Sequence, residues 1–160
     1  MTYPFWLEWL IPLTWMVIFP VNFLKNLLVL VLTMKYLKVM NRKQNVKAVI
    51  LRTWVMEGAA NLIGTATLFI ITQIIRFGRE QNWWKDIKHA IYSNPCDNLG
   101  AFILVTLCIV LVSYYIYRFN YKWCLERANF NDMERKKVAL SLAVFTAPYL
   151  FYLPTEWFYW

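Results

Sequence analysis

Four stretches of the chain are apolar enough and long enough to cross a lipid bilayer, and this feature limits the fold more than any other. A spanning helix needs roughly 20 mostly apolar residues, because each residue rises about 1.5 Å and the hydrocarbon layer is about 30 Å thick. The stretches cover residues 12–34, 53–75, 98–117 and 138–154. They lack the alternation of apolar and polar residues that spanning strands would show. We therefore predict an all-α polytopic membrane helical bundle with four transmembrane spans.

The composition agrees with a membrane location. Hydrophobic residues make up 60% of the chain and charged residues 16%, whereas soluble domains are about 45–50% apolar and about 25% charged. A water-soluble core in a chain of 160 residues is too small to bury this much apolar surface. We expect residues 1–160 to form a single integral membrane domain.

Lysine and arginine are concentrated in two of the three links between the predicted spans. The link 35–52 carries six of the 17 basic residues, and the link 118–137 carries another six. Loops rich in Lys and Arg stay on the cytoplasmic side of a membrane. The pattern predicts that both links are cytoplasmic, that both termini lie outside, and that the protein resides in the cell membrane.

The net charge of +8 raises the question of nucleic acid binding. The basic residues lie at the ends of apolar spans, where membrane topology accounts for them, and no base-reading module is visible. We therefore expect no nucleic acid partner. The basic inner loops are expected to attract anionic lipid headgroups, and the other expected partners are a second copy of the chain or another membrane protein.

The second link is predicted to contain an outer interfacial amphipathic helix over residues 80–92. Trp83, Trp84, Ile87 and Ile91 recur there at helical spacing, with charged residues on the other side. Polar side chains are predicted to cap the helices that follow. Asp97 or Asn98 is expected to cap the third span, and Asn131 with Glu134 resembles a capping box at the start of the fourth. In that fourth stretch, Pro148 predicts a kink.

Side chains for catalysis are scarce. His89 is the sole histidine. Cys96, Cys108 and Cys124 are expected at three different depths, so we expect no internal disulfide, and no two of them have CxxC spacing. The four glycines form no phosphate-binding loop. We predict no catalytic, cofactor-binding or metal-binding residue and no cofactor. A lipid-modifying enzyme is the least favoured of the functions considered.

One set of polar residues lies within the apolar stretches. Asn22, Lys25 and Asn26 fall on one face of the first span, while Glu57 and Asn61 fall on one face of the second. If the two spans are antiparallel, these faces meet, and Lys25 pairs with Glu57. A charge inside the bilayer costs at least roughly 2.5–3.5 kcal/mol, so a partner or water is expected.

This polar stripe has two interpretations. In the first it holds helices together, helped by Ala60 and Gly64, whose small size allows close backbone approach. In the second it lines an ion or proton path, or a solute or headgroup site.

The two interpretations lead to two functions. We expect a non-catalytic accessory, scaffold or assembly subunit that binds other membrane helices. The alternative is a self-assembling small channel or transporter with its site centred on Glu57.

Overall fold

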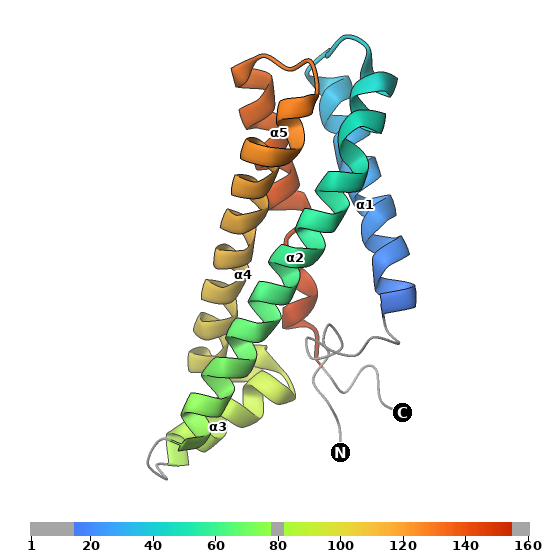
Figure 1. Cartoon of the computed structure of the whole chain (residues 1–160). Coiled ribbons are helices and arrows are strands. Elements are labelled where there is room, and N and C mark those ends of the chain that lie inside the picture. The colour runs from blue at the N-terminus through green and yellow to red at the C-terminus, as the bar shows by residue number, and fades with distance from the viewer. Residues whose placement is uncertain (1–14, 78–81, 155–160) are drawn as a thin grey trace.

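The chain forms a helical bundle in which three helices are long and apolar enough to cross a membrane. The computed structural model describes residues 15–77 and 82–154, and that part contains no strand. The three long helices run antiparallel to their neighbours (Figure 1). They are α1 (Trp15–Tyr36), α2 (Arg42–Phe77) and α4 (Leu99–Phe119). The predicted all-α class is confirmed. Residues 12–14 of the first predicted span lie outside the described residues.

Helix α2 begins much earlier than the predicted second span. Its 36 residues give a length of about 54 Å, which exceeds the thickness of the hydrocarbon layer. The sequence predicts a basic link up to residue 52, but the chain is already helical from Arg42. The reason is packing: Val46, Val49 and Thr53 recur at helical spacing and are all buried. The turn between α1 and α2 is correspondingly short, with positive φ angles at Lys38 (55°) and Asn41 (53°).

The fourth apolar stretch is not one continuous helix. Helix α5 (Asp132–Phe145) is followed by the 3₁₀ turn η5 (Tyr149–Tyr152), so the predicted kink at Pro148 is instead a helix end. Pro148 lacks the N–H that would bond to Val144, and it disfavours helical geometry at the residue before it. The Tyr149 hydroxyl donates to the freed Val144 carbonyl at 2.6 Å. By itself α5 is about 21 Å long, too short to cross the hydrocarbon layer.

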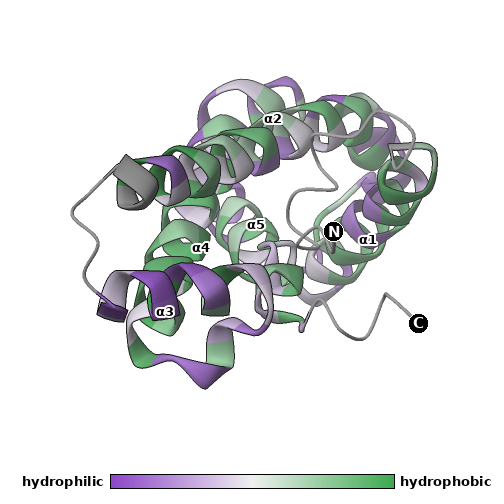
Figure 2. Cartoon of the chain, turned by 90° about the horizontal axis from the view of Figure 1, so that it is seen from below, coloured by the Kyte–Doolittle hydropathy of each residue, from purple (hydrophilic) through white to green (hydrophobic). Residues whose placement is uncertain are grey.

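Helix α5 occupies the middle of the bundle, where α1, α2 and α4 surround it (Figure 2). Its contacts with α1 and α4 form one end of the core, and η5 packs against α4 farther down. Fully buried apolar residues in this core include Leu30, Met34, Val105, Val112, Ile116, Leu142 and Phe151.

The link between α2 and α4 contains α3 (Asn82–Tyr92) and the short 3₁₀ turn η2 (Pro95–Asp97). Helix α3 is amphipathic, with Ile87 and Ile91 buried against the bundle and Trp83 exposed. Residues 80 and 81 of the predicted amphipathic helix lie outside the described residues. The Asn98 side chain accepts hydrogen bonds from the backbone N–H groups of Gly100 and Ala101, so Asn98, rather than Asp97, is the predicted cap of α4.

The two basic links meet at one end of the bundle, at the top of Figure 1. Helix α4 continues there through the π-turn η3 (Asn120–Cys124) and the 3₁₀ turn η4 (Leu125–Arg127). The backbone N–H of Asn129 donates to the Asn45 side chain at 3.3 Å and so joins the links. The predicted capping box of Asn131 and Glu134 is present at the start of α5.

A buried polar cluster as the candidate functional site

Helices α1 and α2 bring the predicted charged pair together. The Lys25 ammonium lies 4.0 Å from Glu57 Oε1, at the outer limit for an ion pair. The two helices run antiparallel through the short turn at residues 37–41, which places the middle of α1 beside the matching part of α2 (Figure 1). Two antiparallel helices thus hold the opposite charges at one level of the bundle.

Burial differs sharply among the five predicted site residues. Glu57 is 1% exposed, and Asn26 and Asn61 are buried as well. The Lys25 side chain remains 34% exposed, although its ammonium is directed at Glu57 and at the Thr146 carbonyl. Asn22, one turn earlier on α1, is half-buried. The carboxylate is therefore fully enclosed, whereas the lysine side chain is only partly covered.

The end of α5 supplies a third component of the cluster that the sequence analysis missed. Lys25 Nζ donates to the backbone carbonyl of Thr146 at 3.1 Å, and the Thr146 side chain lies beside the Glu57 carboxylate. The last carbonyls of a helix have no partner within that helix. Pro148 ends α5 here and leaves the Thr146 carbonyl free to accept a hydrogen bond. The Thr-Ala-Pro sequence within an apolar stretch was the signal of this free carbonyl.

Several polar atoms of the cluster lack a hydrogen bond within the protein. Both Glu57 oxygens, both polar atoms of Asn26 and Oδ1 of Asn61 are buried in this way. The Asn26 side chain lies next to the Glu57 carboxylate, but the two do not meet hydrogen-bond geometry. Buried polar groups are normally paired, because an unmade hydrogen bond costs roughly 1–3 kcal/mol. The oxygens of Glu57, Asn26 and Asn61 therefore have free capacity to accept hydrogen bonds, and the Asn26 amide nitrogen has free capacity to donate them.

An aromatic contact on the same face of α2 fixes the approach of α1. The Trp54 indole N–H donates to the Phe19 carbonyl at 2.9 Å. The rings of Phe19 and Phe23 pack edge-on against the indole, with centroids 5.6 and 5.8 Å away. Trp54 lies one helical turn before Glu57, so this contact positions the carboxylate against α1. The sequence analysis did not assign this role to Trp54.

The remaining residue types that carry chemistry are dispersed. Within residues 15–77 and 82–154, His, Cys, Asp and Glu nowhere gather in a group of three that could hold a metal ion. The three cysteines are free thiols, with Cys96 exposed and Cys108 and Cys124 buried. The cluster around Glu57 therefore remains the candidate site in the described part of the chain.

Comparison with known proteins gives no relative from which a role can be transferred: no family model, no curated protein and no solved structure matches this chain.

Proposed function

We propose that this chain is a non-catalytic membrane protein, an accessory, scaffold or assembly subunit that binds other membrane helices. The observation that carries the proposal is the enclosure of the polar cluster, in which Glu57 is 1% exposed. Lys25 links α1 to Glu57 on α2 and to the Thr146 carbonyl beyond α5. A path for ions or solutes must be accessible, whereas polar contacts that join three segments serve assembly of the bundle.

The proposal includes a membrane topology. Four segments cross the cell membrane, the fourth being α5 together with η5, and both termini lie outside. The two basic links at one end of the bundle are cytoplasmic, and α3 at the other end lies in the outer interface. Support comes from the contact between Asn45 and Asn129, which brings both basic links to one end, as the positive-inside rule requires.

Isolation of the native particle tests the accessory role. The protein is extracted from its own membrane in mild detergent, its mass is measured, and its components are identified. We expect a defined membrane-protein partner at fixed stoichiometry. A bare monomer or a closed homo-oligomer, obtained at several detergent concentrations, would contradict the proposal.

A small channel or transporter is the second candidate, and the observation that favours it is the absence of hydrogen bonds to either Glu57 oxygen. Proton and cation fluxes into liposomes containing the purified protein test this function. For a channel or transporter, Glu57→Gln abolishes flux and preserves the oligomeric state. The matched control is Glu126→Gln, which removes an exposed carboxylate at the basic end of the molecule. Equal flux with wild type and Glu57→Gln would eliminate this candidate.

A further inference from the structure

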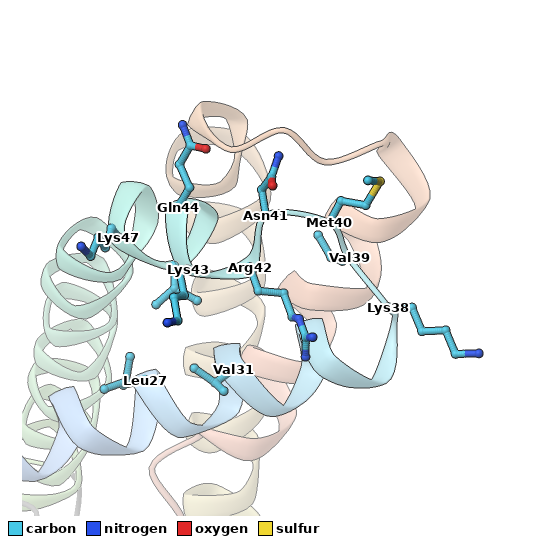
Figure 3. Close-up of a pocket in the computed structure, with 11 residues that line it drawn as sticks. Leu27, Val31, Lys38, Val39, Met40, Asn41, Arg42, Lys43, Gln44 and Lys47 are labelled. Carbon is cyan, nitrogen blue, oxygen red and sulfur yellow. The ribbon is translucent and has the colours of Figure 1, made fainter.

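A groove lies between the last turns of α1 and the start of α2, beside the short turn that connects them (Figure 3). Its volume is about 940 Å³, which is large enough for a small-molecule ligand. The groove has two chemically different sides. One is apolar and includes Leu27 and Val31 of α1, and the other carries the basic residues Arg42, Lys43 and Lys47 of α2.

The basic side chains are directed differently around this groove. Arg42 and Lys43 extend toward α1 and the level of Val31, whereas Lys38 points away from the molecule (Figure 3). All three are exposed. Two cationic groups therefore face the same space as the apolar side chains of α1, and this arrangement suits an amphipathic anion.

No carboxylate in the described part of the chain neutralises these charges. The ion pairs found there join Glu57 to Lys25, and Asp132 to Arg135 and Lys136. At the start of α5, the hydrogen bonds that Asp132 accepts from Lys136 and from the Tyr121 hydroxyl lower the pKa of its carboxyl group to about 2. By contrast, the first turn of α2 contains no acidic residue, so the positive charges of Arg42 and Lys43 add to the positive end of the helix dipole.

The apolar side of the groove continues along α1. Leu27 and Val31 also line a second groove of about 660 Å³, together with Leu24 and Leu28. Leu24 in turn lines a third groove of about 610 Å³, which reaches Pro20. The three grooves share lining residues and follow one another along α1 from the basic turn to Pro20, and together we call them the furrow.

We propose that this furrow binds one anionic phospholipid. The phosphate of the headgroup lies between Arg42 and Lys43, and an acyl chain follows the furrow past Val31, Leu27 and Leu24. A free phosphate ion would use the cationic groups and leave the apolar furrow unused, so the apolar lining next to the cationic groups favours the lipid. The inference requires insertion of α1 and α2 in a bilayer, but it is independent of the proposed accessory role.

Lipid retention on the purified protein tests the charged half of the site. The protein is placed in nanodiscs made of phosphatidylglycerol and phosphatidylcholine with identical acyl chains, then released, and bound lipids are counted by native mass spectrometry. We expect one retained phosphatidylglycerol. In Arg42→Gln/Lys43→Gln the affinity falls by about 30-fold, the loss expected when two charges near a phosphate are removed. The matched control is Arg127→Gln/Lys137→Gln, an equal change at exposed positions of the same end, which retains the lipid.

A second pair of variants tests the apolar half. Val31→Trp fills the furrow and reduces retention, whereas Leu32→Trp, at an exposed neighbouring position outside the lining, leaves it unchanged. Equal losses in the two charge variants would mean general attraction to an anionic surface and would overturn the site. Release of the lipid by millimolar inorganic phosphate, with no effect of Val31→Trp, would identify an anion site without lipid specificity and would overturn it as well.

Discussion

At the scale of single residues, Lys25 and Glu57 contribute unequally to the bundle. Glu57 is enclosed, and its carboxylate has Lys25 as its cationic neighbour at 4.0 Å. Lys25 retains a second partner in the Thr146 carbonyl and is 34% exposed. Removing one member of a buried ion pair is costly because the other charge is left without compensation. Removing Lys25 should therefore destabilise the protein more than removing the charge on Glu57.

This asymmetry gives the first prediction. Lys25→Met should lower the free energy of unfolding by about 2–4 kcal/mol, since it leaves a buried carboxylate without a cation. Glu57→Gln should cost about 1 kcal/mol, because glutamine fits the same space and Lys25 keeps its bond to Thr146. In the double variant the loss should be smaller than in Lys25→Met alone.

Chemical unfolding in detergent micelles, followed by the fluorescence of the nine tryptophans, measures these free energies. Leu28→Met is the control, because it changes an exposed side chain of α1 without altering charge. If Lys25→Met and Leu28→Met unfold alike, the ion pair does not stabilise the bundle.

At the scale of elements, the contact between α2 and α4 depends on Gly64. A Cβ atom at this position would collide with the Val112 side chain of α4, and Phe151 also lies within contact distance. The Gly64 carbonyl additionally accepts a hydrogen bond from the buried Cys108 thiol at 3.2 Å. Gly58 on the same helix is different: an added Cβ would meet only Phe19, at 4.0 Å.

The two glycines provide the second prediction with its own control. Gly64→Ala should destabilise the protein by about 1–3 kcal/mol through overpacking. Gly58→Ala should be neutral or stabilising by up to about 1 kcal/mol, because alanine is the better helix former. Val112→Ala should restore part of the stability lost in Gly64→Ala. Unfolding midpoints in one detergent compare the variants, and equal effects of the two glycine substitutions would disprove a close contact at Gly64.

The elements also show which features of the fold follow from local sequence. The capping box of Asn131 and Glu134 and the amphipathic pattern around Ile87 are local, and the sequence was sufficient to predict both. For the cap of α4, the sequence left a choice between Asp97 and Asn98. The proximity of Lys25 to Glu57 was also predictable, since a short turn between two apolar helices makes them antiparallel.

Features that depend on distant contacts were not predictable in the same way. The early start of α2 depends on burial of Val46 and Val49 by other helices, which a count of basic residues does not reveal. The role of Thr146 depends on α5 ending in the centre of the bundle, next to Lys25. Sequence patterns indicated the charged pair, whereas its third component required the tertiary arrangement.

At the scale of the whole molecule, the two ends of the bundle differ in positive charge. One end carries both basic links, and the opposite end carries α3 and the turn η2 (Figure 1). The cysteines provide a direct probe of these ends, because Cys96 in η2 is exposed while Cys108 and Cys124 are buried in the bundle. A thiol reagent should therefore react with the folded protein at Cys96 alone.

The third prediction follows for the orientation in the membrane. A membrane-impermeant maleimide applied to intact cells should label Cys96, because the end without the basic links is expected outside. With Cys96→Ser as background, Glu126→Cys places a thiol at an exposed position of the basic end, and it should react only after the membrane is permeabilised. Labelling in the reverse order would mean that the protein is inverted. If both thiols react in intact cells, α4 does not cross the membrane, and the proposed four-segment topology fails.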